Sequence, residues 1–183
     1  QIWKIRPDGS GLTRVTDAPT NVAYAVWSPD GSRIAAATTL SDTGTTMYLF
    51  DPNRPWKDQQ PEVLRAPDSL PFGPHSWSPD GRRIAGTSGA SDRGIVLYTL
   101  SSRTYERLTG HGQWPVWLPD SRRLLFVSGG NAFYVVDSET RLVQRVFAVT
   151  RDVIGPPQLT PDGRTLYYTR RVTDADIWLA TLQ

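Results

Sequence analysis

The sequence lacks cysteine, has only two histidines and contains no long apolar run. The absence of cysteine excludes a disulfide framework, a thiol nucleophile and thiolate metal ligands. Because His75 and His111 are the only histidines, a three-histidine metal site is also excluded. No apolar run approaches the roughly 18 residues that a membrane-spanning helix needs, so we expect no membrane span. We therefore predict no metal and no cofactor for this chain.

Lysine is also scarce, because Lys4 and Lys57 are the only lysines and the formal net charge is only +2. No basic block is present, which argues against nucleic acid as a partner. The 183 residues, 38% of them hydrophobic, suit one globular domain with a sizeable core. The chain begins with Gln and shows no signal peptide, so we expect a mature or excised piece of a longer protein. The lack of cysteine suits the cytosol as well as an exported bacterial protein.

One motif is repeated four times along the chain. Each copy places a tryptophan or leucine, a Pro-Asp turn and a β-rich run in the same order. The turn prolines are separated by 50, 40 and 42 residues, which matches the period of about 40–45 residues of a four-stranded propeller blade. The copies are WSPDGSRIAAA from Trp27, WSPDGRRIAGT from Trp77, WLPDSRRLLFV from Trp117 and LTPDGRTLYYT from Leu159.

The turn in each copy is predicted to close a tight β-hairpin. Proline presets the first central position of a type I turn, and aspartate tolerates the second. Gly31, Gly81 and Gly163 then accept a left-handed backbone without steric cost. Ser121 stands at this position in the third copy, where we expect about 1 kcal/mol of strain. We predict that neighbouring residues hold this turn.

Three kinds of strand recur around these turns and predict an all-β fold. A buried strand follows each turn, and a second apolar strand follows about 10–15 residues later. A third kind alternates polar and apolar residues, as half-exposed strands near a sheet edge do. We therefore predict a β-propeller of four-stranded antiparallel blades, with four to five blades in this chain. The first kind covers 33–37, 83–87, 123–127 and 165–169; the second covers 2–5, 47–51, 95–100, 132–137 and 176–182; the third covers 12–16, 62–65, 105–109 and 142–146.

Lettering the strands of a blade A to D from the inside out places the repeated turn between A and B. Trp27, Trp77, Trp117 and Leu159 then end the A strands, and we expect the aromatic rings to wedge between sheets. We expect a single propeller region over 1–183. It divides into a partial blade (1–16), three full blades (22–65, 72–109 and 114–147) and a second partial blade (155–183).

The 17 predicted strands do not close a ring of four or five blades, because both ends of the chain supply a C strand. An open arc exposes strand edges, which natural proteins avoid. We favour a piece of a six- to eight-bladed propeller. A compact ring of about five blades with one incomplete sheet is the alternative.

The pattern WSPDG-x-R-I-A, followed by an (I/M)-(W/Y)-(L/V) strand and an R-L-T strand, resembles the TolB-type, WD40-like β-propeller repeat from Ile2 to Leu182. The resemblance implies a bacterial or archaeal origin and often export, so we expect a periplasmic or extracellular location. TolB-type propellers commonly act as protein-binding platforms. The same repeat also builds the propeller of prolyl-oligopeptidase-type serine peptidases and sensory or adhesive tails of envelope proteins. Fold analogy does not choose among these roles.

No constellation of catalytic residues emerges from the sequence. The segment GTSGA (86–90) lacks the G-x-S-x-G spacing of a nucleophile elbow, and no glycine-rich phosphate loop precedes a helix. The acidic turns lack the spaced carboxylates of an EF-hand, which favours turn-forming aspartate over a calcium site. The arginine pairs at 82–83 and 122–123 are interpreted as solvated strand ends, with a basic rim as the alternative.

The A–B turns of a propeller lie on one face, and the D–A and B–C loops lie on the other. Binding residues concentrate on variable loops held by a rigid scaffold, and aromatic and arginine side chains are the usual interface anchors. For two of the candidates, Tyr24 and Trp114, we favour packing at the inner end of strand A. Trp56 either contacts a partner or tucks under its own loop. The predicted partner-binding residues are Tyr24, Phe72, His75, His111, Trp114 and Arg151.

The sequence favours a non-catalytic module that binds another protein, within a larger exported or envelope protein of a bacterium. One alternative is the propeller that gates a prolyl-oligopeptidase-type peptidase whose catalytic domain lies outside this chain. A carbohydrate-binding or lyase propeller is a further alternative, which the scarcity of histidine makes weaker.

Overall fold

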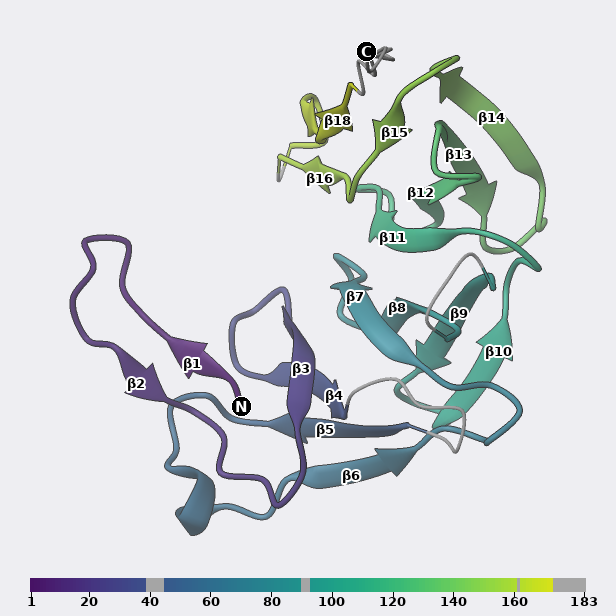
Figure 1. Cartoon of the computed structure of the whole chain (residues 1–183). Coiled ribbons are helices and arrows are strands. Elements are labelled where there is room, and N and C mark those ends of the chain that lie inside the picture. Colours follow the sequence, from purple (N-terminus) through teal and green to yellow (C-terminus); the bar gives the residue numbers. More distant parts are fainter. Residues whose placement is uncertain (39–44, 90–92, 161, 173–183) are drawn as a thin grey trace, which may run out of the picture.

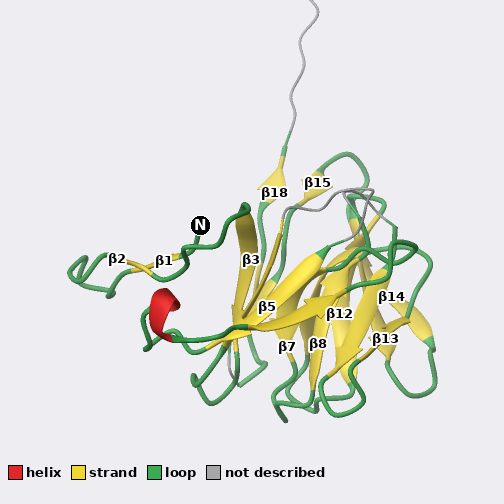
Figure 2. Ribbon diagram, turned by 90° about the horizontal axis from the view of Figure 1, so that it is seen from below, coloured by secondary structure: helices red, strands yellow, loops and turns green. Residues whose placement is uncertain are grey.

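The computed structural model describes residues 1–38, 45–89, 93–160 and 162–172. These residues form successive β-sheets that follow one another along an open arc (Figure 1). Seen after a turn of 90°, loops gather at the two ends of the strands (Figure 2). Among the described residues one short 3-10 turn, η1 (Trp56–Asp58), is the only helical element.

Three of the sheets have four antiparallel strands in chain order, which confirms the predicted all-β fold of four-stranded blades. In each sheet the first strand is the inner one, and the repeated turn joins it to the second, as predicted. Blade 1 contains β3 (Val22–Trp27), β4 (Ile34–Thr38), β5 (Thr46–Phe50) and β6 (Glu62–Arg65); blade 2 contains β7 (Gly73–Trp77), β8 (Arg83–Thr87), β9 (Ile95–Thr99) and β10 (Thr104–Arg107); blade 3 contains β11 (Gln113–Trp117), β12 (Arg123–Ser128), β13 (Ala132–Asp137) and β14 (Val143–Ala148).

The two ends of the arc carry smaller sheets. An N-terminal hairpin pairs β1 (Trp3–Lys4) with β2 (Thr13–Arg14). A C-terminal hairpin pairs β15 (Val153–Ile154) with β18 (Arg170–Arg171) and β16 (Gln158–Leu159) with β17 (Leu166–Tyr167). These two hairpins stand apart at opposite ends of the arc (Figure 1). The strand predicted at 176–182 and the turn residue Pro161 lie outside the described residues.

Each neighbouring pair of sheets shares one apolar cluster. Successive side chains of a strand point to opposite faces of its sheet. Ile84 and Val96 therefore pack against blade 1, whereas Ala85 and Leu97 pack against blade 3. Because both faces are covered, the middle strands are apolar over most of their length, and the core is a series of layers between blades.

Two of the inner tryptophans wedge between blades, as predicted, but Trp27 does not. Trp77 and Trp117 are 7% and 5% exposed, whereas Trp27 is 50% exposed. Each buried ring lies against an arginine of the preceding blade, with Arg33 Cζ 5.7 Å from the Trp77 ring centroid and Arg83 Cζ 4.7 Å from that of Trp117. Among the described residues no arginine lies over the Trp27 ring, and the wedge predicted for Trp27 is not formed there.

The acidic turns are stabilised by their own polar groups. The Ser28 hydroxyl donates to Asp30 Oδ1 at 2.6 Å and accepts the backbone N–H of Arg33 at 2.9 Å. Hydrogen bonds from Ser28 and then Ser32 lower the pKa of Asp30 to about 2. Ser121 has a left-handed backbone with φ 54°, and its hydroxyl accepts the N–H of Asp80 at 3.0 Å. A neighbouring turn thus holds this strained copy, as predicted.

Candidate functional site

The loops of the described residues separate into the two predicted faces. On one face the D–A and B–C loops meet, because the Phe72 N–H donates to Thr45 Oγ1 at 2.9 Å and the Val149 N–H donates to the Asn131 carbonyl at 2.9 Å. On the other face the A–B turn of one blade meets the C–D turn of the next, where an Arg83 N–H donates to Ser138 Oγ at 3.0 Å. We call these the loop face and the turn face.

The inner strand of each blade carries one extra residue near its loop-face end. Between Ala23 and Val26 strand β3 advances three residues, while its partner β4 advances two. The same irregularity interrupts β7 between Pro74 and Ser76 and β11 between Gln113 and Val116. A β-bulge interrupts pairing and re-aims a side chain, and bulges are enriched beside functional sites. The bulged segments hold three of the predicted site residues: Tyr24, His75 and Trp114.

Two of these residues have an uncommon backbone conformation. Tyr24 and Trp114 have φ values of 56° and 55°, in the left-handed region. For a bulky aromatic residue this conformation costs about 1–2 kcal/mol. Such strain persists only where neighbours determine it, and it clusters at functional sites. At Trp114 one such neighbour is visible, because its backbone N–H donates to Thr87 Oγ1 of blade 2 at 3.1 Å.

Tyr24 and His75 come together from neighbouring inner strands. Their rings meet edge to face with centroids 5.8 Å apart and planes at 72°. Tyr24 is 39% exposed, so its packing on the inner strand leaves part of the ring accessible. Burial lowers the pKa of His75 to about 4, so the imidazole is neutral at neutral pH. A neutral imidazole offers one hydrogen-bond donor and one acceptor beside the exposed phenol.

Trp114 and His111 lie at the junction that follows blade 2. Trp114 is partly buried against the cluster between blade 3 and the C-terminal hairpin, which supports the favoured packing role. His111 is exposed, and its Nδ1 lies 2.9 Å from Ser128 Oγ. Its ring also contacts the rings of Phe126 and Tyr134 at 5.7 and 5.6 Å. Within the described ranges no carboxylate contacts His111, so the serine–histidine pair lacks the third group of a hydrolase triad.

Of the two remaining residues predicted to contact a partner, Arg151 is exposed and Phe72 is buried. Arg151 is exposed and makes no side-chain hydrogen bond or ion pair to another described residue. Phe72 is fully buried between blades 1 and 2, with its ring 5.3 Å from that of Tyr105. The prediction that Phe72 contacts a partner is therefore wrong. Trp56 tucks under its own loop, against Tyr48 and Phe50 at 5.8 and 5.3 Å.

The chemistry of the loop face is that of recognition by aromatic and hydrogen-bonding groups. Tyr24 presents an aromatic ring, His75 a neutral imidazole and Arg151 a cation, whereas Trp114 is partly buried. No group of three or more His, Cys, Asp and Glu side chains in the described part of the chain could hold a metal ion. In the same residues, no helix has the length and apolarity needed to cross a membrane.

Bulged inner strands, layered apolar clusters and four-stranded sheets define the chain as β-propeller blades. The solved structures that it resembles include two described as TolB. TolB from Acinetobacter baumannii matches with a TM-score of 0.74 and 24% identity, over 95% of this chain and 44% of that chain. A structure assigned as TolB from Agrobacterium tumefaciens matches with a TM-score of 0.61 and 19% identity, over 93% of this chain and 77% of that one.

These matches show the fold of the chain. Its length is under half that of the Acinetobacter protein, since the match covers 44% of that chain. No family model and no curated protein matches the sequence.

Proposed function

We propose that this chain is a non-catalytic, TolB-like propeller module that binds another protein through its loop face, within a larger exported or envelope protein of a bacterium. The observation that carries the proposal is the pairing of Tyr24 with His75 across two bulged inner strands. An exposed phenol held in a strained backbone by its neighbours is a rigid anchor, and rigid aromatic anchors lose little entropy on binding.

The chemistry of the loop face supports binding rather than catalysis. His75 is neutral and contacts Tyr24, and among the described residues no carboxylate contacts it as the partner of a general base would. His111 and Arg151 add exposed polar side chains on loops of the same face. A polar rim around a central aromatic anchor is the usual anatomy of a protein interface.

Site-specific photocrosslinking tests this proposal. A benzophenone amino acid replaces Tyr24 in the full chain, which is irradiated in a bacterial envelope extract. A matched probe replaces Val63, which is 52% exposed on the outer strand of the same blade. We expect one discrete protein adduct from position 24 and none from position 63, with the adduct reduced when Arg151 is changed to alanine. Equal labelling from the two positions contradicts binding through the loop face.

A further inference from the structure

A cleft of about 630 Å³ opens on the turn face between blades 1 and 2. Its lining includes three arginines and a single acidic residue. Arg33 precedes β4, and Arg82 belongs to the A–B turn of blade 2. Arg103 lies in the C–D turn of blade 2, and its Nη2 pairs with Glu62 Oε1 of blade 1 at 2.6 Å. The cleft lies on the face opposite to the loop face and shares no residue with it.

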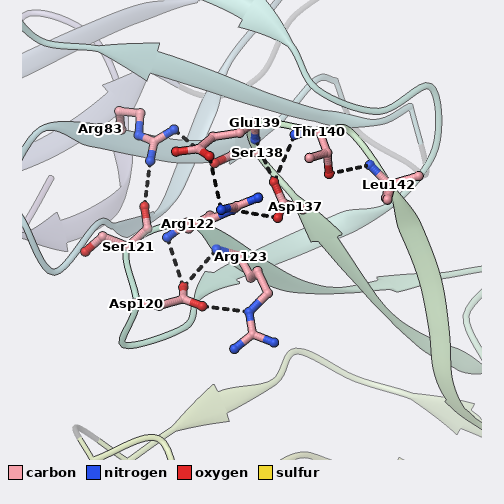
Figure 3. Close-up of polar contacts among 10 residues, drawn as sticks. All are labelled: Arg83, Asp120, Ser121, Arg122, Arg123, Asp137, Ser138, Glu139, Thr140 and Leu142. Atoms are coloured by element: carbon pink, nitrogen blue, oxygen red, sulfur yellow. Dashed lines mark hydrogen bonds and ion pairs between the residues drawn. The ribbon is translucent and has the colours of Figure 1, made fainter.

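The equivalent junction between blades 2 and 3 shows how such arginines are satisfied (Figure 3). Arg122 pairs with Asp137 at 2.7 Å and with Glu139 at 3.2 Å. Arg83 reaches across from blade 2 to Ser138 Oγ at 3.0 Å. The close-up shows these groups converging from the A–B and C–D turns of blade 3. The segment Asp137-Ser138-Glu139 thus provides side-chain acceptors for both arginines, and the Ser121 carbonyl accepts a further hydrogen bond from Arg83.

The register of the strands identifies the residues that replace those acceptors in the first junction. The Leu100 N–H donates to the Arg82 carbonyl at 3.0 Å, as the Ser138 N–H donates to that of Arg122 at 3.0 Å. Leu100 is therefore equivalent to Ser138. Thr99 and Ser101 then stand where the second junction has Asp137 and Glu139. Both carboxylates and the bridging hydroxyl are absent from the equivalent positions.

Within the described part of the chain, these replacements leave two arginines of the first junction without hydrogen-bond acceptors. The Arg33 side chain stacks on Trp77, and neither it nor the Arg82 side chain makes a hydrogen bond or an ion pair to another described residue. Asp80, the acid of the same turn, is engaged by the Ser78 hydroxyl at 2.6 Å and the Arg82 backbone N–H at 3.0 Å. Glu62 pairs with Arg103 and the Asp80 carboxylate partly offsets Arg82, so the cleft keeps an excess of positive charge beside Leu100 and Tyr98.

We propose that this cleft binds an acidic peptide segment of a partner protein, whose carboxylates take the places that Asp137 and Glu139 occupy in the neighbouring junction. Guanidinium groups favour carboxylates because their fixed N–H groups match the geometry of the two oxygens. A peptide fits better than a free anion, because the neighbouring junction is filled by a stretch of backbone with two acidic side chains. The apolar part of Leu100 gives such a backbone a surface to cover.

The probe is the peptide acetyl-Asp-Ser-Glu-amide, titrated into the full chain at low salt. Binding is followed by NMR at the arginine Nε–H resonances. We expect saturable shifts at Arg33 and Arg82, and affinity at least about tenfold weaker in Arg82→Gln, because hydrogen bonds to charged groups are strong. Arg145→Gln is the matched control, since Arg145 is exposed on β14 of blade 3 and does not line the cleft. It should bind as the unchanged chain does.

A second variant tests the same idea without removing an arginine. Thr99→Asp, Leu100→Ser and Ser101→Glu together install the acceptors of the second junction, which should pair with Arg82 and abolish peptide binding. Far-UV circular dichroism establishes that each variant is folded. The proposal is overturned if the peptide does not bind, if Arg82→Gln binds it unchanged, or if the triple variant binds it unchanged. It is also overturned if inorganic phosphate or acetyl-Asn-Ser-Gln-amide binds as tightly as the acidic peptide.

Discussion

Replacing Arg83 with alanine should cost much more stability than the same change at Arg33, although the two arginines are equivalent in the repeat. Arg83 donates to Ser138 Oγ and to the Ser121 carbonyl and lies over the Trp117 ring. Arg33 lies over the Trp77 ring at a longer distance and makes no side-chain hydrogen bond to a described residue. The pair is therefore an internal comparison in which the stacking is shared and the hydrogen bonds are not.

The magnitude follows from the contacts that each variant loses. A hydrogen bond from a charged donor contributes about 1.5–3 kcal/mol, and a cation–π contact about 0.5–2 kcal/mol. Arg83 is partly exposed, so the lower bounds apply, and Arg83→Ala should lower the free energy of unfolding by about 3 kcal/mol. Arg33→Ala should lower it by about 0.5–1 kcal/mol.

Urea denaturation followed by far-UV circular dichroism measures both losses of unfolding free energy. Unchanged m-values would show that each variant exposes the same surface on unfolding. In a chain of this length, thermal midpoints should fall by about 6–12 °C for Arg83→Ala and about 1–4 °C for Arg33→Ala. Losses that agree within about 0.5 kcal/mol would show that the hydrogen bonds across the second junction contribute nothing, and would refute the reasoning.

Two further predictions concern the loop face. Because burial lowers the pKa of His75 from 6.5 to about 4, the folded chain binds fewer protons than the unfolded chain between these values. Stability should therefore fall as pH decreases through this window, and His75→Gln should flatten the slope in pH-dependent denaturation. Gly112→Ala should cost about 2–4 kcal/mol in the same assay, because φ is 105° and the new Cβ would lie 2.3 Å from the Phe126 ring. Gly31→Ala, with open space around its Cβ, should cost about 1 kcal/mol; equal losses would contradict the steric argument.

The blade architecture can be predicted from the sequence because its determinants are local and repeated. Proline, aspartate and glycine specify each inner turn within a few residues, and their spacing reveals the blades. Ser121 illustrates how far this reasoning reaches. Its left-handed backbone follows from the position of glycine in the other copies, and the need for a supporting neighbour follows from the strain. The identity of that neighbour, Asp80, depends on how two blades pack.

The candidate site is less accessible to sequence reasoning, because it depends on contacts between blades. From its sequence position, Phe72 is predicted to be an accessible aromatic residue of a loop. In the structure, Tyr105 from the outer strand of blade 2 covers it. The bulges give a weak signal, an aromatic residue three positions before an inner tryptophan, at Tyr24 and Trp114. This spacing does not specify a left-handed backbone. The pairing of His111 with Ser128 joins residues of a loop and a strand end that no motif connects.

One repeated arginine shows why equal positions in a repeat need not have equal roles. Arg33, Arg83 and Arg123 occupy the same place after the inner turn. The first two stack on a tryptophan of the next blade, but the inner strand of the C-terminal hairpin ends in Leu159. Arg123 instead turns back to Asp120 of its own turn at 2.6 Å. The blade that follows decides whether this arginine seals a junction, lines a cleft or pairs within its own turn. Comparing successive repeats position by position is therefore more informative about binding than a consensus of the motif.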